Sequence, residues 1–110
     1  MKETIQELSK QIYQDTVGIR RHLHANPELS YQEVKTGKYI ANQLESLGID
    51  YEHGIAENGV VGLIKGKNPD KKVIALRADF DALPIFEAND VSYKSQNEGV
   101  MHACGHDVHI

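Results

Sequence analysis

The fold class is decided by one stretch of the 110-residue chain, Val73-Ile74-Ala75-Leu76-Arg77-Ala78-Asp79-Phe80-Asp81. Its first four residues are apolar without alternation, which is the pattern of a β-strand covered on both faces. Such strands lie inside the sheets of α/β proteins, between layers of helices. We therefore predict an α/β domain in which residues 72–79 form a buried strand.

Two helices are predicted before this strand. The first begins at the capping pattern Thr4-Ile5-Gln6-Glu7 and ends by Asn26, because Pro27 disfavours helical geometry in the residue before it. Its buried face is marked by apolar residues at helical spacing: Ile5, Leu8, Ile12, Ile19 and Leu23. The second helix is predicted over residues 31–47, after the capping pattern Ser30-Tyr31-Gln32-Glu33, and Gly48 can close it in a left-handed conformation.

Short strands are predicted at residues 50–53, 59–65 and 72–79, with a hairpin turn at residues 67–70 between the last two. Two helices cannot cover both faces of a sheet whose central strand is this apolar. The sequence therefore predicts that residues 1–110 are one continuous part of a larger layered domain.

The composition excludes several classes of protein. Hydrophobic residues make up 40% and charged residues 25% of the chain, as in ordinary globular domains. The net charge of −4 is not gathered into blocks, which argues against nucleic acid or a membrane surface as the main partner. Apolar runs are too short for a membrane span, and Met-Lys-Glu-Thr does not begin like a signal peptide. Cys104 is the single cysteine, so a reducing, cytoplasmic location is predicted.

The most informative segment is residues 102–109, which holds one thiol, three imidazoles and one carboxylate. Cys104 and His106 are two positions apart, so on extended backbone they point the same way, and Gly105 leaves the approach to an ion open. A lone cysteine is more often a small buried hydrophobe than a ligand. The clustering nevertheless favours a metal shared by Cys104 and His106.

The sequence indicates the roles of the other histidines less clearly. His102 and His109 are either further ligands or neighbours of the site, and a helix starting after Gly105 would put His106 and His109 on one face. Asp107 would then lie in the first turn, at the positive end of the helix dipole. The remaining histidines are spread out, and structural roles are predicted for all three: His22, His24 and His53.

Asp79 and Asp81 follow the predicted strand, where ligands of open α/β sheets gather. An equally open alternative is that Asp79 pairs with Arg77 and Asp81 only turns the loop. Neither reading completes a catalytic site, because a catalytic zinc takes three protein ligands and no free glutamate stands near Cys104 and His106 as a base. A cysteine hydrolase with a histidine base is disfavoured by the Cys-x-His spacing, which suits a common ion better.

Four blocks of the sequence, in this order, resemble the amidohydrolase branch of metallopeptidase family twenty, which includes N-acyl-L-amino acid amidohydrolases, hippurate hydrolases and auxin-amino acid conjugate hydrolases. The blocks lie at residues 20–30, 59–62, 74–85 and 101–107. The most specific strings are Leu-His-x-x-Pro-Glu-Leu-Ser and His-Ala-Cys-Gly-His-Asp. Arg77 stands where other branches of the family have a histidine ligand, which is typical of the amidohydrolase branch.

The resemblance implies a three-layer αβα catalytic domain with a mixed sheet, of which residues 1–110 are the N-terminal part. It implies a centre of two divalent metal ions, Zn²⁺, Mn²⁺ or Co²⁺, with Cys104 and His106 as ligands and Asp79 as the carboxylate that supports a metal-bound histidine. The implied reaction is hydrolysis of the amide bond of an N-acyl amino acid, a small-molecule substrate, to a carboxylic acid and an amino acid.

Relatives are several times longer, and their lid domain, their general base and two later histidine ligands have no counterpart in residues 1–110. We therefore expect the 110-residue chain to be inactive alone and to self-associate through exposed strand edges and apolar faces. The alternative from another class of protein is a small metal-binding module without catalysis.

Overall fold

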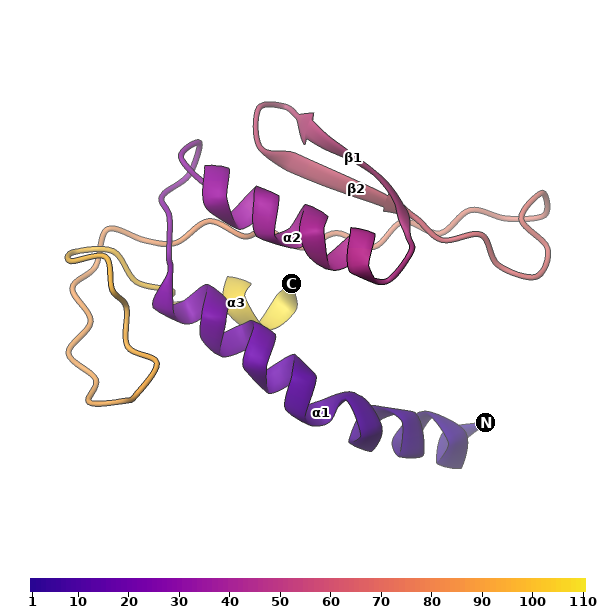
Figure 1. Cartoon of the computed structure of the whole chain (residues 1–110), viewed down its shortest axis with the longest axis horizontal. Coiled ribbons are helices and arrows are strands. Elements are labelled where there is room, and N and C mark those ends of the chain that lie inside the picture. Colours follow the sequence, from indigo (N-terminus) through magenta and orange to yellow (C-terminus); the bar gives the residue numbers. More distant parts are fainter.

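The computed structural model describes residues 1–110 and contains both helices and strands (Figure 1). In chain order these are α1 (Lys2–Ala25), α2 (Val34–Ser46), β1 (Asp50–Ile55), β2 (Gly59–Leu63) and α3 (His106–His109). The hairpin of β1 and β2 lies against α2, and the short α3 lies against α1. Helices packed with a small antiparallel sheet confirm the predicted α/β class.

α1 ends at Ala25, directly before Asn26 and Pro27, as predicted. It begins at Lys2, earlier than predicted, with Met1 as its cap and no side-chain capping bond. The capping pattern at Thr4 is not used, because the Ile5 amide already donates to the Met1 carbonyl at 3.0 Å.

α2 begins at Val34 rather than at residue 31. Tyr31 has a φ of 64°, a left-handed conformation that cannot belong to the helix. The free amides of the first turn are instead bound by Glu28, which accepts from the Thr36 amide at 2.7 Å and the Thr36 hydroxyl at 2.8 Å. The helix closes as predicted, since Gly48 has a φ of 67°.

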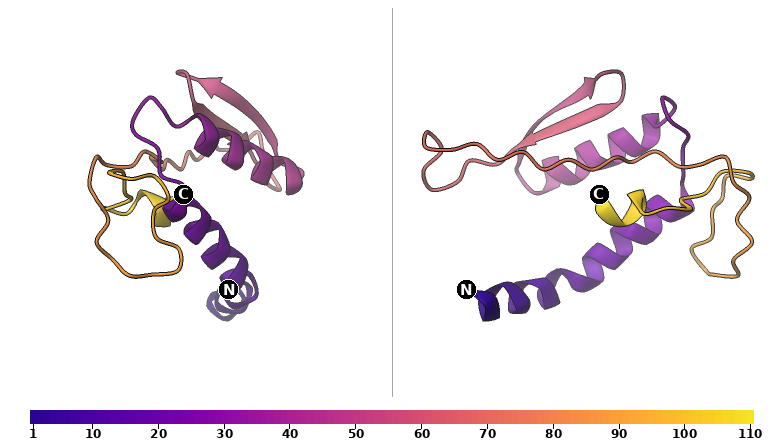
Figure 2. Two further views of the ribbon diagram at one scale, coloured as in Figure 1. Left: turned by 60° about the vertical axis from the view of Figure 1, so that its left-hand side comes forward. Right: turned by 180° about the vertical axis from the view of Figure 1, so that it is seen from behind.

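The hairpin forms between β1 and β2, not between residues 59–65 and 72–79 as predicted. Its turn places Ala56 and Glu57 at φ values of 48° and 82°. Residues 72–79 are not a strand, and Leu76 is 96% exposed, so the predicted buried strand is wrong for this structure. The reason is the absence of a hydrogen-bonded neighbour, because this segment runs back along the molecule unpaired (Figure 2).

The core is small and lies at the C-terminal end of α1. Leu23 and Pro27 are buried there, and two isolated bridges, Leu29 with Ala82 and Leu83 with Met101, tie the later loops to it. The N-terminal half of α1 projects beyond the rest of the molecule (Figure 2), so the predicted apolar face is exposed at its first three residues, Ile5, Leu8 and Ile12. None of the helices has the length and apolarity that a bilayer crossing requires.

Candidate metal centre

The predicted ligands line a small cavity between two loops. The antiparallel bridge of Leu83 with Met101 brings residues 81–83 beside residues 101–106. The cavity has a volume of about 190 Å³ and is lined by Asp81, Ala82, Leu83, His102, Ala103, Cys104 and His106. The structure therefore brings Cys104 and His106 together in one hollow.

His106 is the best-oriented side chain of this cavity. Its Nδ1 lies 2.8 Å from the backbone carbonyl oxygen of Asp81 and 3.0 Å from the Asp81 carboxylate. Because a carbonyl oxygen only accepts, Nδ1 carries the hydrogen and donates it. In the neutral ring Nε2 then carries the lone pair. Metal-binding histidines are usually held in this way, with one ring nitrogen donating a hydrogen bond and the other nitrogen free to bind the metal.

Cys104 supplies the sulfur donor, since its thiol is free and exposed. α3 begins directly after Gly105, as predicted. A Cβ at Gly105 would lie 3.1 Å from Cε1 of His109, so this glycine makes room for the His109 ring. The His109 ring lies beside Gly105 and does not line the cavity, and no hydrogen bond of its side chain is present.

His102 is a buried imidazole on the wall of the same cavity. Its residue is 5% exposed, and its Nε2 has no hydrogen-bond partner. Burial lowers the pKa of His102, opposed by Asp107 and Asp81 and assisted by His24 and His106. A neutral ring with an unpartnered nitrogen beside Cys104 and His106 fits a site that takes a cation.

The donor set is nevertheless incomplete. No three of the His, Cys, Asp and Glu side chains lie close enough together to hold a metal ion. The sulfur and nitrogen donors present have the chemistry for a divalent transition metal, and further ligands would be needed to enclose it.

Asp79 does not line the cavity that holds Cys104 and His106. Its carboxylate pairs with Arg77 at 2.7 Å and is half-exposed, which is the alternative that the sequence left open. The carboxylate that contacts His106 is that of Asp81, two positions further on. The predicted support of a metal-bound histidine by Asp79 stays a prediction.

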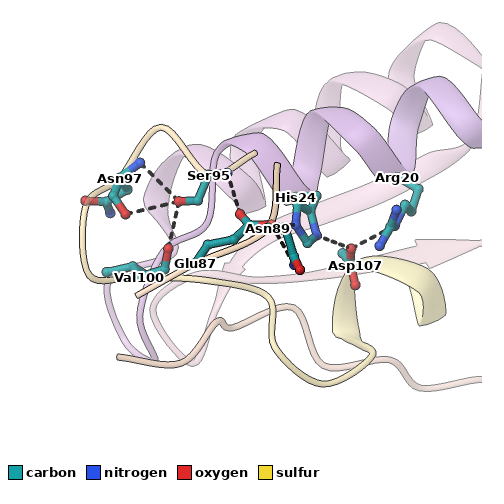
Figure 3. A network of polar contacts seen from close by, with 8 residues as sticks. All are labelled: Arg20, His24, Glu87, Asn89, Ser95, Asn97, Val100 and Asp107. Atoms are coloured by element: carbon teal, nitrogen blue, oxygen red, sulfur yellow. Dashed lines mark hydrogen bonds and ion pairs between the residues drawn. The ribbon is translucent and has the colours of Figure 1, made fainter. Parts of the chain in front are cut away.

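A buried polar network connects the last turns of α1 with α3 and with the loop that contains Glu87 (Figure 3). His24, in the last turn of α1, contacts Asp107 through Nδ1 at 2.8 Å and Glu87 through Nε2 at 2.9 Å. Sequence reasoning gave His24 an unspecified structural role and did not single out Glu87. The available signal was that His24 and Asp107 both lie inside the most specific family strings.

Known proteins are similar to this chain in sequence and in structure. The sequence profile of peptidase family M20/M25/M40 matches residues 75–110, the segment that contains Asp81, Cys104 and His106. The whole chain is 50% identical to thermostable carboxypeptidase 2 of Saccharolobus solfataricus, over 27% of that protein's length. The chain is therefore similar to members of peptidase family M20/M25/M40.

Two further proteins show the same partial coverage. An N-acyl-L-amino acid amidohydrolase of Geobacillus stearothermophilus is 45% identical over 98% of the chain and 29% of its own length. The solved structure of Bacillus subtilis YXEP, described as a dinuclear metal-binding peptidase of the family, matches 89% of the chain with a TM-score of 0.83 at 45% identity, and 27% of its own chain. The chain thus spans 27–29% of the length of these three proteins.

Proposed function

We propose that this chain supplies the first ligands of a two-metal centre for hydrolysis of the amide bond of N-acyl amino acids. The observation that carries the proposal is the contact between His106 Nδ1 and the Asp81 carbonyl oxygen. With the hydrogen on Nδ1, the Nε2 lone pair of the neutral ring is free to bind a cation. The similarity to an N-acyl-L-amino acid amidohydrolase supports the substrate class. The single cysteine supports a cytoplasmic location.

Each residue has a defined task in this proposal. Cys104 gives a thiolate and His106 a neutral imidazole, a pair that suits Zn²⁺ or Co²⁺ better than a hard cation and leaves Mn²⁺ as a weaker candidate. Asp81 holds the Nδ1 hydrogen of His106 and so fixes the ring's orientation. A pair of divalent cations in such a centre would polarise the scissile carbonyl and lower the pKa of a bound water.

The cavity that holds Cys104 and His106 offers no free carboxylate as a general base, since Asp81 is the one carboxylate that lines it. Asp81 is committed to His106, and Glu87 is committed to His24. We therefore expect no hydrolysis by the isolated chain, and the lack of a third ligand leads us to expect only weak metal binding by it.

A chimera tests the enzymatic proposal. Residues 1–110 replace the matching part of the Geobacillus stearothermophilus amidohydrolase, and release of amino acid from an N-acyl amino acid is measured. Activity is expected, with losses of at least about 100-fold in Cys104→Ser and His106→Asn, because each removes a ligand. His22→Gln, on the exposed side of α1, is the control that retains activity. An active chimera that tolerates both ligand substitutions would disprove the assignment.

A further inference from the structure

We infer that His24 is held doubly protonated between Asp107 and Glu87 and, in that form, positions the segment that carries Cys104 and His106. The first half of this inference stands on the network alone. The second half rests on the proposed function of Cys104 and His106.

The geometry of the ring requires two hydrogens. Nδ1 of His24 lies 2.8 Å from Asp107 Oδ2, and Nε2 lies 2.9 Å from Glu87 Oε1. With both carboxyl groups ionised, a neutral imidazole, which has one N–H, would set a nitrogen lone pair against a carboxylate oxygen at one of the two contacts. The side chains are 5%, 2% and 1% exposed for His24, Asp107 and Glu87, so water cannot relieve that repulsion.

Charge balance leads to the same protonation state. Two buried carboxylates face the ring, and the one other cation in contact with them is Arg20, whose Nε lies 2.9 Å from Asp107 Oδ2. Arg20 balances the charge of one carboxylate, so the second carboxylate is balanced only when His24 is an imidazolium. The other titratable groups near the ring are Tyr93, edge-on at 5.5 Å between ring centroids, and His102 at 6.5 Å.

Both carboxylates are fixed from their other sides. Glu87 also accepts from the Ser95 amide at 2.6 Å and from Asn89 at 3.2 Å, which anchors it in the loop (Figure 3). Asp107 lies in the first turn of α3. His24 is therefore the link between α1, the loop of residues 87–95 and α3.

This link reaches the candidate ligands through the main chain. Asp107 directly follows His106, so holding its carboxylate fixes the peptide from which the His106 ring projects toward the Asp81 carbonyl. Loss of the link frees that peptide, and the His106 ring loses its single orientation. His24 is by this argument a positioning residue that touches neither the cation nor a substrate.

The first experiment records ¹⁵N ring spectra of the labelled 110-residue chain and needs no variant. His24 is expected to show hydrogen on both nitrogens at pH 7, and a single neutral tautomer would overturn the inference. Glu87→Gln replaces one carboxylate by a group that can donate, so His24 should then lose the Nε2 hydrogen. Glu52→Gln, on exposed β1, is the matched control and should leave the His24 spectrum unchanged.

The second experiment measures positioning. In His24→Gln and in the milder Glu87→Gln, the neutral His106 ring should no longer show hydrogen on Nδ1 alone, whereas His22→Gln should keep it there. Binding of Co²⁺ by calorimetry should weaken about tenfold in His24→Gln and not in His22→Gln. An unchanged His106 tautomer and unchanged Co²⁺ affinity in folded Glu87→Gln and His24→Gln would overturn the positioning role. Wild type that binds no Co²⁺ but shows doubly protonated His24 would contradict metal binding by the 110-residue chain and support the link itself.

Discussion

Glu87 is the single residue whose ionisation is most altered by the fold. Burial raises the pKa of its carboxyl, but hydrogen bonds from His24, the Ser95 amide and Asn89, together with the charge of His24, outweigh burial and lower the pKa to about 2 from an ordinary 4.5. A carboxyl with a lowered pKa in the folded state stabilises that state above its unfolded pKa. This stabilisation is lost as the pH falls from about 4.5 toward about 2.

Urea denaturation of wild type and Glu87→Gln at several pH values measures this effect. We expect wild type to be the more stable at pH 7, and the difference to shrink steadily between pH 4.5 and pH 2. Glu52→Gln serves as the control, since an exposed substitution should stay within about 0.5 kcal/mol of wild type. A difference between wild type and Glu87→Gln that is constant over this range would contradict the account of Glu87.

At the scale of single elements, α2 depends on a cap supplied from outside its own sequence pattern. Glu28 binds the Thr36 amide and hydroxyl, whereas no hydrogen bond from the Ser30 side chain is present. Glu28→Ala should lower the free energy of unfolding by about 1 kcal/mol, as for loss of a helix cap. Ser30→Ala, at the cap that the sequence predicted, should change it little. Equal losses in the two variants, measured by denaturation, would show that Glu28 is not the cap.

Two helical glycines make a matched pair. A Cβ at Gly18 of α1 would meet nothing within 4 Å, whereas a Cβ at Gly37 of α2 would lie 2.6 Å from the Asn58 carbonyl oxygen. Gly18→Ala should therefore stabilise the chain by about 0.5–1 kcal/mol through helix propensity. Gly37→Ala should destabilise it by about 1–3 kcal/mol, because the backbone of the hairpin turn must move. Thermal unfolding of both variants checks the opposite signs.

Features set by local sterics could be predicted from the sequence, and features set by distant partners could not. Pro27 ends α1 and Gly48 closes α2 because each acts on its own backbone. The cavity shared by Cys104 and His106 was likewise predictable from their spacing. The contact of His24 with Asp107 joins residues 83 positions apart, and neither residue type carries a signal for the other. For the same reason, the apolar character of residues 72–79 could be read from the sequence, but the presence or absence of a neighbouring strand that pairs with them could not.

At the scale of the whole molecule, two sets of exposed apolar side chains lie on different kinds of surface. One is the face of α1 formed by Ile5, Leu8 and Ile12, and the other is the unpaired segment with Val73, Ile74 and Leu76. The two differ in kind, since α1 offers side chains only, whereas the unpaired segment also offers free backbone amides and carbonyls for strand pairing. Exposed apolar surface of both kinds favours association, so we expect the 110-residue chain to form oligomers in solution.

Sedimentation velocity of charge-matched variants would separate these two surfaces. Leu8→Lys with Ile12→Lys should shift the chain toward the monomer, because two buried charges in an apolar contact are costly. Gln6→Lys with Gln14→Lys adds the same charge at exposed polar positions of α1 and should sediment like wild type. Ile74→Lys with Leu76→Lys tests the unpaired segment, where a larger shift is expected because strand pairing adds backbone hydrogen bonds to the apolar contact. Wild type that sediments as a monomer at every concentration would show that neither surface drives association.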